Sequence, residues 1–251
     1  MIKLKGKKVL VVGLGQTGES AVRFLVAQGA KVTVTDTKTK AELSERLASL
    51  ANLKFEQEFG RHNPKHFTSS DYIVLSPGVS THLEYLNEAR SKNIPILNDI
   101  ELAYPFIKAP IIAVTGTNGK TTTATLISEM LKASGKSVFT GGNIGNPILN
   151  FLLNPEKIDV CVLELSSFQL ESIQSFKPTV AVFTNLEPNH LDRYPLGLDS
   201  YYAAKRRLIK NADRSTHLVL NLDNERTAQL VDGFNGKTYY FTKRNPIVFN
   251  G

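Results

Sequence analysis

Cysteine is almost absent from this chain of 251 residues, in which Cys161 is the only one. A single thiol excludes a disulfide framework and fits a reducing compartment. No apolar run approaches the roughly 20 residues of a transmembrane helix, so we expect no membrane span. The first eight residues, MIKLKGKK, include basic side chains but no apolar signal-peptide core. We therefore expect a cytoplasmic, globular protein.

A basic stripe interleaved with aromatic residues, typical of nucleic-acid binding, is also missing. The formal net charge is +7. Residues 1–200 hold 21 basic and 19 acidic side chains, whereas residues 201–251 hold 9 and 4. The excess therefore lies mostly in the last fifth of the chain. We interpret it as a solvated surface that attracts anionic substrates, and we expect no nucleic-acid partner.

Apolar runs alternate with segments of helical spacing along the whole chain. We predict strands at 7–12, 32–36, 72–75 and 94–97, with helices at 20–28, 42–51 and 83–92. After an interruption at Pro105 to Pro110, we predict strands near 111–115, 137–140, 158–164, 179–184, 216–220 and 238–241, and helices near 120–134, 167–174, 199–211 and 224–231. This alternation indicates two α/β domains with parallel sheets, at residues 1–107 and 108–251.

Residues 115–122, TGTNGKTT, directly follow the apolar run at 111–114 and precede a helical pattern. A strand, a glycine turn, a lysine and two hydroxyls form the layout of a phosphate-binding loop at a helix N-terminus. The loop is short, G-x-x-G-K-T, because Val114 stands where the common motif has its first glycine. An ordinary strand–turn–helix connection is the alternative. We predict that the loop binds the phosphates of a ligand through Gly116, Thr117, Asn118, Gly119, Lys120, Thr121 and Thr122; the family resemblance described below implies that this ligand is ATP.

A second glycine motif, Gly13-Leu14-Gly15-Gln16-Thr17-Gly18, follows the first strand and opens a helix. Asp36 stands at the end of the next strand, as in dinucleotide-binding folds. The ligand stays open at this point between NAD and another nucleotide diphosphate. A glycine turn that merely lets strand and helix pack is the simpler alternative. The Ser76-Pro77-Gly78 turn ends what we predict to be the third strand, and it would line the same crevice. Taken alone, this motif is more simply interpreted as a plain Pro-Gly turn.

Four more polar segments follow predicted strand ends or lie on a helix of the second domain. They are GGNIG at 141–145, LELSSFQL at 163–170, TNLEPNHLD at 184–192 and YYAAK at 201–205. Together with TGTNGKT, they resemble the Mur ligases, the ATP-dependent amide-forming enzymes of peptidoglycan synthesis. The segments at 141–145 and 163–170 look most like the members that add D-glutamate to UDP-N-acetylmuramoyl-L-alanine. The resemblance covers essentially the whole chain.

The resemblance implies a fold class, substrates and cofactors. The fold would be a Rossmann-like N-terminal parallel sheet followed by a P-loop-type α/β ATPase domain that is truncated. The substrates would be UDP-N-acetylmuramoyl-L-alanine, D-glutamate and ATP with Mg²⁺, and the protein would be a monomer. In this family the first domain holds a uridine diphosphate rather than NAD. The implied substrate-binding residues are Gly15, Gln16, Thr17, Asp36, Thr37, Ser76, Gly78, Asn143 and Ser166.

The resemblance also assigns catalytic and metal-binding roles. Lys120 would stabilise the transferred phosphoryl group, and Thr121 and Glu164 would hold one Mg²⁺. His190 would serve a second metal ion. Lys205 matches a family lysine that becomes carbamylated and so supplies an anionic oxygen ligand. Without the resemblance, a loop histidine that caps Asp192 and a solvated helix lysine would be the simpler interpretations of His190 and Lys205.

The family pattern continues beyond Gly251 with more of the central domain and a third α/β domain. We therefore expect this chain to bind the sugar nucleotide and ATP but to form little amide. Three alternatives stay open from the residues: a nicotinamide-dependent oxidoreductase, a non-catalytic nucleotide-binding module and a folylpolyglutamate synthase. The first leaves Lys120, Glu164 and His190 unexplained, and the last would lack the glycine crevice of the first domain.

Overall fold

The computed structural model describes residues 2–189, 194 and 197–243, and their contacts divide the chain into two compact units. Unit 1 comprises residues 1–108 and 146–156, and unit 2 comprises residues 109–145 and 157–251. Each unit contains one sheet in which all strands run parallel, as we predicted for the fold class. Among the described residues, no helix combines the length and the apolar character needed to cross a bilayer.

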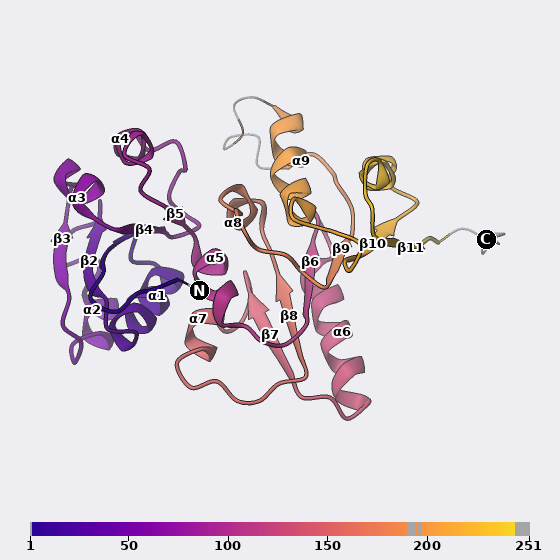
Figure 1. Ribbon diagram of the computed structural model, residues 1–251, viewed down its shortest axis with the longest axis horizontal. Coiled ribbons are helices and arrows are strands. Elements are labelled where there is room, and N and C mark those ends of the chain that lie inside the picture. The colour runs from indigo at the N-terminus through magenta and orange to yellow at the C-terminus, as the bar shows by residue number, and fades with distance from the viewer. Residues whose placement is uncertain (1, 190–193, 195–196, 244–251) are drawn as a thin grey trace. The chain divides into compact units, whose positions relative to one another are not determined.

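The sheet of unit 1 has the strand order β3-β2-β1-β4-β5 (Figure 1). Its strands are β1 (Lys8–Val12), β2 (Lys31–Asp36), β3 (Glu56–Phe59), β4 (Tyr72–Leu75) and β5 (Ile96–Leu97). Its helices are α1 (Gln16–Ala27), α2 (Ser44–Ser49), α3 (Pro64–Ser69), α4 (Tyr85–Ser91), α5 (Asp99–Ala103), the 3-10 turn η1 (Tyr104–Phe106) and α7 (Ile148–Phe151).

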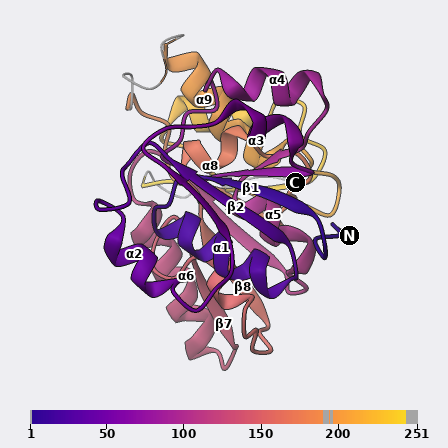
Figure 2. The ribbon, with the colours of Figure 1, turned by 90° about the vertical axis from the view of Figure 1, so that its left-hand side faces the viewer.

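Helices cover both faces of this first sheet. Figure 2 shows α3 and α4 on one face and α1 on the other. On the α3 face, Leu10 and Val12 of β1 pack with Phe67 of α3 and Leu86 of α4 in one buried cluster. This burial on both faces explains why the strands read as nearly continuous apolar runs. Helix α7 comes from residues 146–156, far along the chain, and packs against α1 and α5.

The sheet of unit 2 has the order β11-β10-β9-β6-β8-β7. Its strands are β6 (Ile111–Thr115), β7 (Val138–Gly142), β8 (Val160–Glu164), β9 (Val180–Phe183), β10 (His217–Asn221) and β11 (Lys237–Phe241). Its helices are α6 (Lys120–Ala133), α8 (Ser167–Glu171), α9 (Leu198–Arg206) and α10 (Glu225–Ala228), with the 3-10 turns η2 (Arg207–Ile209) and η3 (Gln229–Val231). Ala124 of α6 packs on the valines of β6, β8 and β9.

Strand order decides which loops meet at the carboxyl edge of this second sheet. β6 lies between β8 and β9, although β7 follows β6 in the chain. The loop at residues 116–119, which follows β6, is therefore flanked by the segments that follow β8 and β9. In open parallel sheets, ligands bind outside the carboxyl ends of the strands.

Four elements were not predicted from the sequence: β3, α3, α5 and α7. The β3 sequence, EQEF, lacks an apolar run because the strand lies at the sheet edge with two exposed residues. The three helices have only four to six residues each, too few for a periodic pattern. Our prediction that Ser76 follows the third strand of unit 1 was wrong, because it omitted β3. Ser76 follows the fourth strand, β4.

Candidate active site

The turn between β6 and α6 has the backbone of an anion-binding loop. Gly116 has φ +149°, and a β-carbon added there would meet the Thr184 hydroxyl oxygen at 1.9 Å. Gly119 is the N-cap of α6 at φ +77°, and no side chain caps this helix. The N–H groups of the first turn of α6 are therefore left for a ligand, and the helix dipole favours an anion there.

The loop after β9 holds this turn in place. The backbone N–H groups of Thr117 and Asn118 donate to the Asn185 main-chain and side-chain oxygens, each at 2.9 Å. The Thr184 hydroxyl donates to the Asn118 carbonyl at 2.6 Å. We assigned no role to Asn185 from the sequence, although its position directly after a strand was a usable signal. The interlocked loops fix the conformation that a phosphate would meet.

The Thr117 side chain points into the protein. It is 7% exposed. Its hydroxyl oxygen accepts the Glu187 N–H at 2.9 Å and lies 3.0 Å from the Tyr201 hydroxyl on α9. Any contact of Thr117 with ATP therefore falls to its backbone. By contrast, Asn118, Gly119, Thr121 and Thr122 are exposed.

Two lysine ammonium groups converge on the carbonyl groups of the same loop. Lys120 Nζ donates to the Thr117 carbonyl at 2.8 Å, and Lys205 Nζ, from α9, donates to the Gly116 carbonyl at 2.7 Å. Lys205 is only 2% exposed. Burial, reinforced by the charge of Lys120, lowers the pKa of Lys205 to about 7, while the Glu164 carboxylate acts in the opposite direction.

Glu164 ends β8 and joins α6 to the segment after β7. Its carboxylate accepts the Thr121 hydroxyl at 2.7 Å and the Asn143 side-chain amide at 2.9 Å. The Asn143 backbone N–H donates to the Glu164 carbonyl at 2.8 Å. Gly142 permits this approach, because a β-carbon there would meet the Glu164 carbonyl oxygen at 2.4 Å. Thr121, Asn143 and Glu164, all predicted site residues, are thus brought together.

The donor set fits a divalent cation whose coordination is completed by phosphate and water. Thr121 and Glu164 supply hard oxygens, which Mg²⁺ prefers, and Mg²⁺ commonly keeps several waters. Within the described ranges, no group of three or more His, Cys, Asp or Glu side chains forms a closed metal site. His190, the predicted ligand of a second ion, lies outside the described residues.

In unit 1, the Gly13–Gly18 turn also presents an uncapped helix. Gly15 is the N-cap of α1 without a side-chain hydrogen bond, and a β-carbon there would meet nothing within 4 Å. At Gly18, a β-carbon would meet the Gly13 carbonyl oxygen at 2.0 Å. The turn therefore combines the close strand–helix packing of our simpler alternative with open backbone at Gly15 that an anion can approach.

Asp36 and Ser76 brace this turn. The Asp36 carboxylate accepts the N–H groups of Leu14 at 2.7 Å and Lys38 at 2.9 Å, and the Ser76 hydroxyl donates to the Gly13 carbonyl at 2.7 Å. His62, which we did not single out from the sequence, faces the same strand end. Its pKa is lowered by burial, although the charge of Asp36 opposes this effect. The other predicted residues of this edge are wholly or partly exposed: Gln16, Thr17, Thr37 and Gly78.

Ser166 has a structural role that our prediction did not include. It is the N-cap of α8, where its hydroxyl accepts the Gln169 N–H at 3.3 Å and the Gln169 side chain accepts the Ser166 N–H at 3.2 Å. This reciprocal pair is a capping box. Its sequence signal, a serine followed three residues later by glutamine, was present. The geometry fixes the start of α8 directly after the strand that carries Glu164.

Family models match both units. The Mur ligase middle domain matches residues 114–247, which is more than half of the chain, and the Mur ligase MurD-like N-terminal domain matches residues 7–98. The chain belongs to the Mur ligase family. The family resemblance inferred from the sequence is thus confirmed. The N-terminal match also argues against a folylpolyglutamate synthase, whose first domain would lack the glycine crevice.

Curated relatives of this Mur ligase chain include UDP-N-acetylmuramoylalanine–D-glutamate ligases. The protein from Desulfatibacillum aliphaticivorans is 44% identical over 241 residues, which are 96% of this chain and 53% of the relative. The protein from Bdellovibrio bacteriovorus is 43% identical over 253 residues, covering 98% of this chain and 54% of the relative. The chain therefore spans about half the length of the curated relatives it matches.

Solved structures support the fold of this Mur ligase chain. The UDP-N-acetylmuramate:L-alanyl-gamma-D-glutamyl-meso-diaminopimelate ligase from Neisseria meningitides has a TM-score of 0.62 at 18% identity, covering 94% of this chain and 78% of that chain. A murein peptide ligase from Psychrobacter arcticus has a TM-score of 0.56 at 17% identity, covering 94% and 53%. At these identities, the likeness concerns the fold alone.

Proposed function

We propose that this chain is the nucleotide-binding part of an ATP-dependent amide ligase that adds D-glutamate to UDP-N-acetylmuramoyl-L-alanine. One observation carries the proposal. The loop at residues 116–119, the two lysines Lys120 and Lys205, and the Thr121–Glu164 pair converge at the uncapped N-terminus of α6. The names of the relatives supply the substrates, including D-glutamate as the second one.

The proposed reaction has two steps. A substrate carboxylate attacks the γ-phosphate of ATP, which forms an acyl phosphate and releases ADP. The amine of D-glutamate then attacks the acyl carbon, loses a proton and releases phosphate as the amide forms. The first step requires charge neutralisation and in-line positioning more than covalent protein chemistry. Within the loop at residues 116–122, the backbone N–H groups of residues 119–122 would hold the phosphates of ATP, because those of Thr117 and Asn118 donate to Asn185. Lys120 would exchange its bond to the Thr117 carbonyl for a phosphate oxygen and stabilise the phosphoryl group as it moves.

Mg²⁺ would offset the repulsion between ATP and the substrate carboxylate. Thr121 and Glu164 would hold one ion, for which the buried carboxylate supplies negative charge and the exposed hydroxyl a neutral oxygen. Asn143 would orient the Glu164 carboxylate and face the substrate. His190 would serve a second ion, and Ser166 would contact substrate from the start of α8.

Lys205 is the proposed site of carbamylation. Its unprotonated amine would attack CO₂ and lose a proton, which forms an anionic carbamate whose oxygens can bind a metal ion. A pKa of about 7 leaves a large unprotonated fraction at neutral pH. With ¹³C-labelled bicarbonate, we expect a carbamate signal in the carbon NMR spectrum that Lys205→Ala removes and the exposed-lysine variant Lys210→Ala retains. An identical signal in Lys205→Ala would refute this assignment.

Unit 1 would bind the uridine diphosphate of the sugar nucleotide. The N–H groups at Gly15, Gln16 and Thr17 would receive the diphosphate at the start of α1. Asp36 and Ser76 would keep the turn in its open shape through their bonds to Leu14 and Gly13. Thr37 and Gly78, which follow the two strands on either side of β1, would complete the crevice. We further propose that the chain is a monomer.

A thermal-shift panel of ligands tests the proposal against its rivals. We expect UDP-N-acetylmuramoyl-L-alanine and ATP with Mg²⁺ each to raise the melting temperature, because a ligand that binds only the folded state stabilises it. NADH should cause no shift. Stabilisation by NADH, without any by the UDP-sugar, would favour the nicotinamide-dependent oxidoreductase. A lack of response to both proposed ligands would refute the proposal.

A further inference from the structure

A cleft of about 610 Å³ lies in unit 1 at the end of the sheet opposite the glycine turn. Its walls come from the amino ends of β1 and β2, from the segment that enters β3 and from the last turn of α3. Three lysines line the cleft: Lys8, Lys31 and Lys54. We call these three residues the lysine row. The proposed nucleotide sites lie at carboxyl ends of strands, so neither includes this cleft.

The lysine row runs across two neighbouring strands, β1 and β2, to the segment that enters β3. Lys8 of β1 and Lys31 of β2 are register partners. Thr33 pairs with Glu56, so the same register, two residues earlier, places Lys54 beside Lys31. Like charges directly opposite one another on neighbouring strands are destabilising. An anion held between these ammonium groups would relieve that repulsion.

The nearby carboxylates are engaged with other groups. Asp71 accepts the Lys7 ammonium at 2.9 Å and the Lys8 backbone N–H at 2.8 Å, and Glu56 accepts the Thr33 hydroxyl at 3.0 Å. The Glu58 carboxylate lies 2.8 Å from His66 Nε2. Within the part of the chain that the structure describes, no hydrogen bond or ion pair involves a side-chain ammonium of the lysine row.

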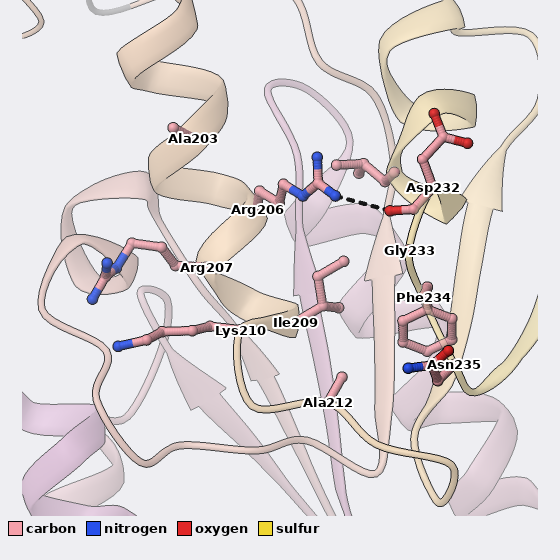
Figure 3. A pocket seen from close by; sticks show the side chains of 11 residues that line it. Ala203, Arg206, Arg207, Ile209, Lys210, Ala212, Asp232, Gly233, Phe234 and Asn235 are labelled. Carbon is pink, nitrogen blue, oxygen red and sulfur yellow. Dashed lines mark hydrogen bonds between the residues drawn. The ribbon is translucent and has the colours of Figure 1, made fainter.

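A second cavity, of about 470 Å³ in unit 2, provides a contrast (Figure 3). It is also lined by basic residues, but its guanidinium groups already have partners. Arg206 donates to the Asp232 carbonyl at 3.0 Å, and Arg207 donates to the Leu170 carbonyl at 3.0 Å. Each cavity is lined by one carboxylate, Asp232 in the second cavity and Glu56 in the cleft of the lysine row, where Glu56 accepts the Thr33 hydroxyl. The cleft of the lysine row is the better anion site because its three ammonium groups, unlike the two guanidinium groups, have no hydrogen-bond partner among the described residues.

We propose that the lysine row binds a phosphorylated small molecule with at least two negative charges. The three ammonium groups match a diphosphate or a doubly ionised phosphate ester, because charge-assisted hydrogen bonds to phosphate oxygens are strong. The Ser69 hydroxyl can add a neutral donor, and half-buried Phe55 provides an apolar wall for the organic part of the ligand. This site is separate from both nucleotide sites proposed above.

A tryptophan placed in the cleft can report the binding. The chain has no tryptophan, so Phe55→Trp introduces a single fluorophore into the lining. Titration with inorganic pyrophosphate should give a saturable change in its emission. Adding Lys31→Gln and Lys54→Gln should weaken the apparent affinity by about tenfold or more, since two of three cations are lost. The matched control is Lys40→Gln with Lys92→Gln, which removes the same charge away from the cleft.

A lack of any saturable change, or equal affinities in the cleft and control variants, would overturn the proposal. So would a signal that survives the cleft substitutions but disappears in Lys120→Ala, because the pyrophosphate would then be binding at the loop of unit 2. If Phe55→Trp does not fold, calorimetric titration of pyrophosphate into the Lys120→Ala chain, with and without the two cleft substitutions, provides the same comparison.

Discussion

At the scale of single residues, the candidate active site contains two buried ionisable side chains, Glu164 and Lys205. Both are 2% exposed and both lie beside the loop at residues 116–119. The Glu164 carboxylate accepts hydrogen bonds from two donors, Thr121 and Asn143. Lys205 donates to one carbonyl, and its pKa is lowered by burial and, to a smaller extent, by the neighbouring charge of Lys120. We make one prediction for each of these two residues.

The first prediction concerns magnesium. Glu164→Gln keeps the size of the side chain but removes its charge, so ATP should bind at least ~10-fold more weakly in the presence of Mg²⁺. ATP without Mg²⁺ should bind the variant and the parent chain with similar affinity. Calorimetric titration with and without Mg²⁺ measures both. Glu129→Gln, an exposed position on α6, is the control. An unchanged Mg²⁺ dependence in Glu164→Gln would exclude Glu164 as a metal ligand.

The second prediction concerns pH. The pKa of Lys205 is about 7 in the folded chain, below the ordinary value of 10.5. Between these values the unfolded state binds more protons, so the free energy of unfolding gains a contribution that rises with pH. In CO₂-free buffer, we expect it to rise more steeply from pH 7 to pH 9 in the parent chain than in Lys205→Met, measured by urea unfolding. Equal slopes would show that this pKa is not depressed.

At the scale of elements, the apolar strands could be predicted from the sequence and their order in the sheet could not. The runs at 111–114 and 160–163 are recognisable as strands because both faces of the sheet are covered. The pairing of β6 with β9 joins segments about 70 residues apart, and no local pattern encodes it. The lock between the loop at 116–119 and Asn185, and the inward turn of Thr117, follow from that pairing and were therefore missed.

The third prediction tests the lock between these two loops. Gly116→Ala would place a methyl group 1.9 Å from the Thr184 hydroxyl oxygen at a positive φ, so it should destabilise the chain by ~2 kcal/mol or more. Gly119→Ala also has a positive φ but open space, and should cost only ~1 kcal/mol. Urea unfolding of the two variants provides the comparison. If Gly119→Ala is the more damaging substitution, the packing of Gly116 against Thr184 is not what constrains the loop.

At the scale of the whole molecule, each unit repeats one design. A parallel sheet ends in a glycine turn, and an uncapped helix begins there, α1 in unit 1 and α6 in unit 2. Two glycine motifs after similar apolar strands were the basis for predicting two domains. The sequence did not indicate that residues 146–156 pack with unit 1, because α7 is a four-residue helix within the second alternation.

In the proposed function, the glycine turn of unit 1 and the glycine turn of unit 2 bind different nucleotides. Calorimetric titration of one variant in each turn tests this most directly. Asp36→Ala should lose binding of UDP-N-acetylmuramoyl-L-alanine and retain binding of ATP with Mg²⁺, because it removes the brace of the turn in unit 1 only. Lys120→Ala should show the reverse. Loss of both ligands in one variant that remains folded, or retention of both ligands in both variants, would contradict the account.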